Sequence, residues 1–244
     1  MFPIHDDNPT PVVPYVTYAL IASCIGIFAY QFLQGEAGQL DMVYSYGMIP
    51  AAFFGHAELA SEFVRVPAHA TIFTSMFLHG GFMHLAGNML YLWVFGNNIE
   101  AAMGHVKFIC FYLLTGIIAA LSHALPDMNS QIPMIGASGA ISGVLGAYLL
   151  LYPQARVLIL IPIFFIIKTV RVPAMLVLVI WFLMQLFSSV TAGDSEGGGV
   201  AFGAHIGGFI AGMVLVTFFK HANVPLQIPF MHFDPFERFR KGPR

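Results

Sequence analysis

Residues 134–146 read MIGASGAISGVLG, and this stretch decides how the fold of the whole chain is interpreted. Ser138 stands between Gly136 and Gly139 at the start of an apolar run. The small residues can serve close packing between helices, in which serine substitutes for glycine. Alternatively, the serine performs chemistry at the N-terminus of a helix, which requires a base within hydrogen-bond reach of its hydroxyl.

The composition of the chain is that of a membrane protein. Of the 244 residues, 58% are hydrophobic and 9% are charged, whereas soluble domains carry roughly 25% charged residues. The long apolar runs therefore predict an integral membrane protein surrounded by lipids. The net charge of −2 gives no reason to expect a nucleic-acid partner. Both cysteines lie in apolar segments, so we interpret them as packing residues and not as a disulfide.

Six apolar segments are predicted to cross the bilayer. We expect an all-α integral membrane protein, a bundle of six transmembrane helices. The run 157–167 is too short for a further crossing and contains Pro162. It is interpreted as a re-entrant or interfacial element, with a hairpin-like element on the membrane face as the alternative. The predicted crossing segments are approximately residues 12–32, 82–99, 108–125, 138–152, 173–188 and 200–219.

The distribution of basic residues agrees with six crossings. If both termini lie on the inner side, nine of the ten lysine and arginine residues fall inside and only Arg65 falls outside, as the positive-inside rule requires. The predicted organisation is an N-terminal segment of residues 1–11, a six-helix domain of residues 12–220 and a C-terminal tail of residues 221–244. Because no organellar targeting segment is evident, the expected location is the cytoplasmic membrane of a prokaryotic cell, with both termini in the cytoplasm.

The fourth segment is predicted to begin below the membrane surface. At 1.5 Å per residue, residues 138–152 form a helix of about 22 Å, while the hydrocarbon core is about 30 Å thick. If the end near Arg156 lies at the inner surface, the loop before Ser138 dips into the membrane. Non-helical backbone at that depth is tolerated only where protein buries it or where it lines a cavity. Ser138 is therefore expected at a helix N-terminus, facing a cavity open to the outside.

A candidate base lies in the sixth segment. An ionisable residue such as His205 is costly inside a membrane span and is a candidate for function; a histidine that only bonds a neighbouring helix is the alternative. Two stripes of small residues predict close contact between the fourth and sixth helices, which brings His205 towards Ser138. The stripes are Ala204, Gly208 and Gly212 on the sixth helix and Gly139, Gly143 and Gly146 on the fourth.

A third polar cluster opens the second segment, in residues 79–88. His84 and Asn88 are four residues apart and face the same side of a helix. Their side chains are suitable donors for an oxyanion, whereas His79 points elsewhere or lies in the loop. Histidines in a membrane could also bind zinc, but the chain has no H-E-x-x-H motif and no carboxylate inside these spans. No metal and no cofactor are therefore expected.

Three motifs in this order strongly resemble the rhomboid family of intramembrane serine proteases. They are HGGFMHLAGN at residues 79–88, GASG at residues 136–139 and AHIGGFIAG at residues 204–212. The resemblance extends from Val12 to Lys220 and implies a rhomboid-like bundle with a membrane-dipping loop before its fourth helix. It also implies a Ser–His dyad without an aspartate, in which Ser138 is the nucleophile and His205 acts first as general base and then as general acid.

The resemblance implies roles for the residues around the dyad. His84 and Asn88 match the family's oxyanion-stabilising positions, together with the backbone N–H of Ser138. Gly136 matches a loop glycine that faces bound substrate, and Gly139 follows the nucleophile on the small face of the helix. His79 matches a histidine that organises the outer loop.

The chain departs from the family pattern at Ser142. The family commonly carries an aromatic residue at this position, stacked on the catalytic histidine ring. The orientation of His205 must therefore come from another part of the chain.

The expected function is that of an intramembrane serine endopeptidase, which cleaves single-span membrane proteins near the outer face. Helix-destabilising residues near the cleavage site are expected to favour a substrate, because a regular helix shields its backbone. The bulky fifth segment is a candidate gate, and the glycine-rich loop 191–203 is a candidate cap over the site. The alternative is a catalytically silent rhomboid-like protein that binds transmembrane helices. The sequence predicts no particular oligomeric state.

Overall fold

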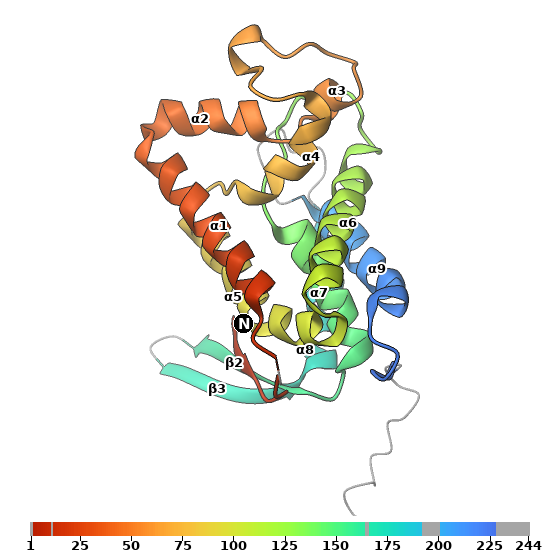
Figure 1. Cartoon of the computed structure of the whole chain (residues 1–244). Coiled ribbons are helices and arrows are strands. Elements are labelled where there is room, and N and C mark those ends of the chain that lie inside the picture. The colour runs from red at the N-terminus through yellow and green to blue at the C-terminus, as the bar shows by residue number, and fades with distance from the viewer. Residues whose placement is uncertain (1, 11, 164–165, 192–200, 228–244) are drawn as a thin grey trace, which may run out of the picture.

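The computed structural model describes residues 2–10, 12–163, 166–191 and 201–227. These residues form a bundle of long helices with a small sheet at one end (Figure 1). Shorter helices that connect α1 (Tyr15–Leu33) to α5 (Phe82–Met103) lie at the other end. We refer to these two ends as the sheet end and the loop end. The expected C-terminal tail lies largely outside the described residues, as do residues 192–200 of the expected cap at 191–203.

Each segment that was predicted to cross the membrane contains a long helix. Besides α1 and α5, these helices are α6 (His105–Ala124), α7 (Ser138–Leu151), α8 (Ala174–Thr191) and α9 (Phe202–Phe219). Among the described residues, α1, α6 and α9 are long and apolar enough to cross a membrane, while α7 and the apolar part of α8 are shorter. The number of crossings therefore stays a prediction.

The loop end positions the segment that precedes α7. It contains α2 (Gly35–Tyr46), α3 (Pro50–Phe53) and α4 (Thr71–Thr74), with 3₁₀ turns at 61–63, 68–70 and 75–77. Met48 and Met134 exchange two backbone hydrogen bonds of 3.0 and 2.8 Å, and the N–H of Gly136 donates to the carbonyl of Ser75 at 2.8 Å. These bonds hold the chain immediately before Ser138.

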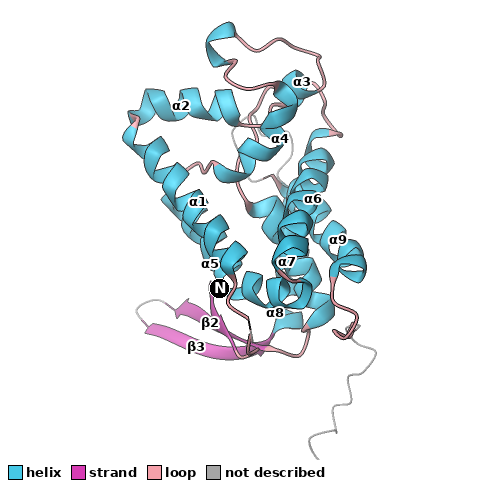
Figure 2. Ribbon diagram, viewed as in Figure 1, coloured by secondary structure: helices cyan, strands magenta, loops and turns pink. Residues whose placement is uncertain are grey.

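The expectation of an all-α fold is wrong, because the sheet end contains three antiparallel strands in the order β1–β2–β3 (Figure 2). They are β1 (Phe2–Asp6), β2 (Arg156–Ile163) and β3 (Ile166–Pro173). The run 157–167 is thus part of a hairpin, which was the alternative interpretation. Its valines and isoleucines favour a strand over a helix, and residues 2–6 supply a third strand from the far end of the sequence.

Asp6 ties the N-terminal strand to the helices. The hydroxyl of Tyr148 in α7 donates a 2.5 Å hydrogen bond to its carboxylate. Burial raises the pKa of Asp6, although the bond from Tyr148 acts in the opposite direction. The side chain of Asn98 in α5 also donates to the carbonyl of Asn8 at 3.0 Å. The N-terminal segment therefore packs against the predicted helical domain, and the division at residue 11 stays a prediction.

Glu100 caps a helix to which it does not belong. From the last turns of α5, its buried carboxylate accepts hydrogen bonds from the backbone N–H groups of Val16 and Thr17, at 2.9 and 2.8 Å, and from the Thr17 hydroxyl at 2.7 Å. A carboxylate at a helix N-terminus satisfies free N–H groups and stabilises the helix dipole. His105 bonds the same carboxylate at 2.5 Å, so Glu100 fixes α1 against the turn between α5 and α6.

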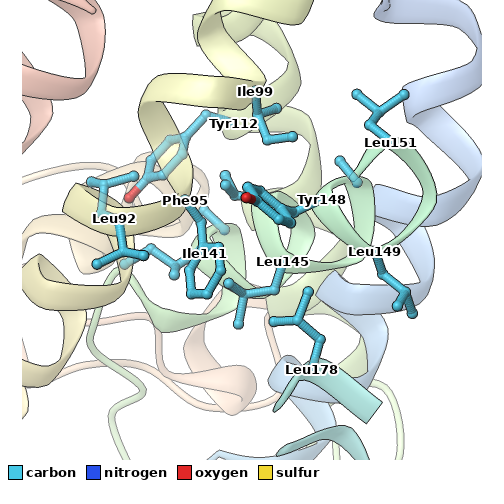
Figure 3. Close-up of a cluster of buried hydrophobic side chains, with 14 of the residues drawn as sticks. Leu92, Phe95, Ile99, Tyr112, Ile141, Leu145, Tyr148, Leu149, Leu151 and Leu178 are labelled. Carbon is cyan, nitrogen blue, oxygen red and sulfur yellow. The ribbon is translucent and has the colours of Figure 1, made fainter. Parts of the chain in front are cut away.

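The helix α7 lies at the centre of the bundle. Almost all of its side chains are buried, and a helix that is apolar all round belongs in the interior. Figure 3 shows its Ile141, Leu145 and Tyr148 among side chains from α5, α6 and α8. This central position fixes where the first residue of α7, Ser138, can lie.

The two stripes of small residues meet as predicted. A Cβ atom added to Gly208 would overlap the carbonyl oxygen of Gly139, and one added to Gly212 would overlap that of Gly143. A Cβ at Gly146 would likewise overlap the carbonyl of Phe209. The backbones of α7 and α9 therefore touch, which is possible only because glycine has no side chain.

Candidate active site

The structure places Ser138 and His205 in hydrogen-bond contact. The Oγ atom of Ser138, the first residue of α7, lies 2.8 Å from Nε2 of His205 in the first turns of α9. His205 is buried with 8% of its surface exposed, while Ser138 is partly exposed. The backbone contact between α7 and α9 produces this pairing, because both residues lie near the same end of the two glycine stripes.

The other ring nitrogen of His205 contacts α8. Nδ1 lies 2.7 Å from Oε1 of Gln185. Because an amide oxygen only accepts, this contact places the imidazole proton on Nδ1 and leaves Nε2 free to accept from the Ser138 hydroxyl. A serine hydroxyl bonded to the unprotonated nitrogen of an imidazole is an arrangement in which a base can activate a nucleophile.

An aromatic ring contacts His205, but it comes from α8 and not from position 142. The ring centroid of Trp181 lies 5.8 Å from that of His205, with 37° between the planes. Ser142 instead donates a 2.6 Å hydrogen bond to the carbonyl of Ser138 within α7. The contact of Gln185 with His205 was not predicted from the sequence, although one polar residue within the apolar run AMLVLVIWFLMQLF was a usable signal.

His84 presents an N–H group to the same site. Its Nδ1 accepts a 3.3 Å hydrogen bond from the N–H of Gly80, so the ring proton of the neutral imidazole is on Nε2. Nε2 points at the loop before α7, since a Cβ atom added to Gly136 would lie 2.7 Å from it. A donor directed at the nucleophile loop suits the stabilisation of a developing oxyanion.

Gly136 is required on two grounds. Its φ of +121° is one that residues with side chains rarely adopt, and an added Cβ would press on His84. We expect Gly136→Ala to lower kcat by at least about tenfold, because His84 or the loop must shift and misplacement of a catalytic group by about 1 Å costs on this scale or more.

The measurement is the rate of substrate cleavage by purified Gly136→Ala. Gly55→Ala is the matched control, because Gly55 also has a positive φ, of +73°, but has open space where a Cβ would lie. Equal loss of activity in both variants would show that backbone strain alone, and not the contact with His84, explains the effect.

Asn88 lies one turn after His84 on α5. It is 7% exposed, and its side-chain nitrogen has no hydrogen-bond partner among the described residues. A buried donor without a partner costs roughly 1–3 kcal/mol, and such groups often have a role in binding or catalysis. The position suits a donor that finds its partner only when a substrate is bound.

His79 packs against His84 and is fully buried. Its backbone exchanges hydrogen bonds with the Gln31 side chain of α1, at 3.0 and 3.4 Å, and its Nδ1 contacts the carbonyl of Phe77 at 3.3 Å. Its ring meets the His84 ring edge-on, with centroids 5.2 Å apart. His79 therefore supports His84 and joins the loop to α1.

The described residues contain no group of three or more His, Cys, Asp or Glu side chains that could hold a metal ion. The expectation that no metal takes part stays a prediction. In the part of the chain that is described, Arg65 forms an ion pair with Asp41, and the His105 ring bonds the Glu100 carboxylate. Neither pair belongs to the candidate site, which is built from serine, histidine and amide groups.

The chain belongs to the rhomboid family. The model of the Rhomboid domain matches residues 67–222, which include every residue of the candidate site.

Individual relatives match shorter stretches. The chain is 34% identical over 100 residues to Rhomboid protein 1, mitochondrial, of Saccharomyces cerevisiae, which covers 39% of this chain and 29% of that protein. It is 31% identical over 136 residues to Rhomboid protease GluP of Bacillus subtilis, covering 56% and 24% of the two chains. With Presenilin-associated rhomboid-like protein A, mitochondrial, of Danio rerio, it shares 31% identity over 112 residues, covering 43% and 29%. The matches thus span only about a quarter of each relative.

These relatives overturn the expected location in a prokaryotic cytoplasmic membrane. The proteins from Saccharomyces cerevisiae, Danio rerio and Rattus norvegicus carry mitochondrial names and point to a mitochondrial membrane. The expectation was wrong because it rested on the lack of a targeting segment, and such an absence is no guide to location.

Proposed function

We propose that the chain is an intramembrane serine endopeptidase in which Ser138 is the nucleophile and His205 is the base. The observation that carries the proposal is the 2.8 Å contact between Ser138 Oγ and His205 Nε2. It is supported by the contact of Nδ1 with Gln185, which leaves Nε2 able to accept a proton. One relative, GluP, is named as a protease.

In the first step, Ser138 Oγ attacks the carbonyl carbon of the scissile peptide bond, and its proton passes to Nε2 of His205. The new C–O bond gives a tetrahedral intermediate with a negative oxygen. The imidazolium then gives its proton to the leaving nitrogen, the C–N bond breaks, and an acyl-enzyme remains on Ser138.

Three donors are proposed to stabilise the negative oxygen of the intermediate. They are Nε2–H of His84, the side-chain NH₂ of Asn88 and the backbone N–H of Ser138. The last is one of the N–H groups that a helix leaves without an internal partner. The loss of one such donor commonly lowers kcat by about 10²–10³-fold.

The second step needs water at Ser138. His205 Nε2 removes a proton from the water molecule, which attacks the acyl carbon, and the serine leaves with that proton. In a bundle of six crossing helices, the start of α7 would lie below the surface and the preceding loop would dip towards it. Such a site can be reached from water at the loop end while the helices exclude lipid.

A substrate helix is proposed to approach along α8. The outer face of this helix has an open hollow of about 540 Å³, lined by Leu183, Met184, Gln185 and Phe187 among others. Most of these side chains are apolar, and Gln185 reaches from the hollow to His205. Transmembrane proteins with a locally destabilised helix near the loop end are therefore the proposed substrates.

The direct test uses purified protein in liposomes with a single-span substrate that carries Gly or Pro near the loop-end surface. We expect cleavage within or next to the membrane segment, and none by Ser138→Ala. If wild type and Ser138→Ala both copurify with the substrate and both leave it intact, the protein is instead the silent helix-binding alternative.

A further inference from the structure

We propose that Gln185 is the third member of the site, a positioning residue that sets the tautomer and orientation of His205. The inference rests on the proposed function of Ser138 and His205. It replaces, with a side chain from α8, the orienting aromatic residue that the family commonly has at position 142.

The hydrogen bond between Gln185 and His205 determines which ring nitrogen carries the proton. A base for Ser138 must have its lone pair on Nε2, so its neutral ring must carry the proton on Nδ1. Gln185 Oε1, at 2.7 Å, is an acceptor for that proton. Without an acceptor, the ring is free to place the proton on Nε2, where it blocks attack by Ser138.

The ring of His205 also packs against α8. Trp181 lies one turn before Gln185 on α8, so the two side chains share a helix face. The Trp181 ring lies against the His205 ring at a tilt of 37°, and the Gln185 amide oxygen contacts Nδ1 of that ring. Trp181 and Phe182 also pack against Phe209 of α9, with ring centroids at 6.0 and 4.7 Å. The histidine is therefore held between its own helix and α8.

Gln185 carries a half-buried amide on an apolar helix. In an apolar helix within a membrane, a glutamine side chain costs free energy unless its polar atoms are hydrogen-bonded. Gln185 is the polar residue among large apolar neighbours from Ala174 to Phe187, and the bond to His205 satisfies its oxygen. The bond therefore reduces the cost of placing a glutamine at this position of an apolar helix.

The placement on α8 also links substrate approach to catalysis. The first turns of α8 are anchored, since Ala174 and Met175 donate backbone bonds to Ala155 and Pro153, at 2.7 and 3.0 Å. Towards its end, Leu183, Met184 and Leu186 are exposed. Displacement of this end would remove Gln185 from His205, so the dyad is aligned only while α8 is docked on α9.

The kinetic test compares Gln185→Met, which has similar length but no strong acceptor, with Gln185→Glu, which keeps acceptor oxygens. Leu176→Met, at an exposed position near the start of α8 and outside the hollow, is the matched control. For cleavage of one single-span substrate, we expect Gln185→Met to lower kcat about tenfold, the factor commonly associated with one hydrogen bond, with KM unchanged. Gln185→Glu is expected to retain most of the wild-type kcat, and Leu176→Met is expected to match wild type.

Other kinetic outcomes overturn the proposal. Wild-type kcat in Gln185→Met would show that the bond does not support catalysis. A rise in KM at constant kcat would make Gln185 a substrate contact. Equal losses in the Met and Glu variants would point to packing and not to the acceptor.

A second measurement does not depend on proteolysis. NMR of ¹⁵N-histidine-labelled protein in detergent reports which ring nitrogen of His205 carries the proton, with the signal assigned by its loss in His205→Asn. We expect the proton on Nδ1 in wild type and a mixture of tautomers in Gln185→Met. A proton on Nε2 in wild type would overturn the role of Gln185 even if the protease is active. Conversely, the expected NMR result in a protein that never cleaves would leave Gln185 in place and refute the proposed function.

Discussion

Replacement of Ser138 by alanine is expected to lower the rate of substrate cleavage by at least about 10³-fold while the protein stays folded. The reason is that the nucleophile of a covalent mechanism is lost, and only donor groups and binding remain. Ser142→Ala is the matched control, because Ser142 is one turn away on the same helix and its hydroxyl bonds the α7 backbone. The control should cleave at nearly the wild-type rate.

His205→Ala is expected to cause a loss of similar size. Residues that act as one unit are strongly non-additive, so the double variant Ser138→Ala with His205→Ala should be no slower than either single variant. Rates are measured on the same substrate in the same detergent or lipid. Losses that multiply in the double variant would show that the two residues do not act in one step.

Gly212→Val is expected to have the largest effect on stability. A valine side chain at this position must displace the α7 backbone, because even a Cβ atom would overlap the carbonyl of Gly143. We expect a loss of roughly 3 kcal/mol in the free energy of unfolding, at the upper end of the usual cost of overpacking. That is a large share of the roughly 5–15 kcal/mol by which native domains are stable.

The measurement is the unfolding transition of the purified protein in mixed micelles. Gly26→Val in α1 is the control, since a Cβ at Gly26 meets nothing within 4 Å. Similar stability of the Gly212→Val and Gly26→Val variants would contradict the backbone contact between α7 and α9.

Local signals in the sequence were enough for the helices and for the pairing of the two main residues. Apolar runs located the long helices, and the motif GASG marked the first residue of α7. The stripes through Gly208 and Gly139 predicted which two helices touch, because small residues at a spacing of four let two helix backbones approach closely. From that contact it followed that His205 lies near Ser138.

The sheet could not be derived in the same way. The hairpin of β2 and β3 needs only local pairing, and it was considered, but residues 2–6 pair with residues 157–160. A pairing between the two ends of a long stretch of chain leaves no periodic pattern near either partner. The bond between Asp6 and Tyr148 is of the same kind.

The role of Gln185 was missed for a related reason. The distance between Gln185 and His205 depends on how α8 packs against α9. The contacts of Trp181 and Phe182 with Phe209 determine that packing. Hydropathy identifies such a helix but does not fix its rotation. A lone glutamine in an apolar run indicates that a polar partner exists without identifying that partner.

In the proposed mechanism, Ser138 is an activated nucleophile that depends on His205. The most direct test is covalent labelling of the purified, folded protein with a fluorophosphonate, followed by mass spectrometry of the labelled peptide. We expect phosphonate on Ser138 in wild type, with none in Ser138→Ala and almost none in His205→Ala. Label on another residue, or label of equal rate in His205→Ala, would contradict this mechanism.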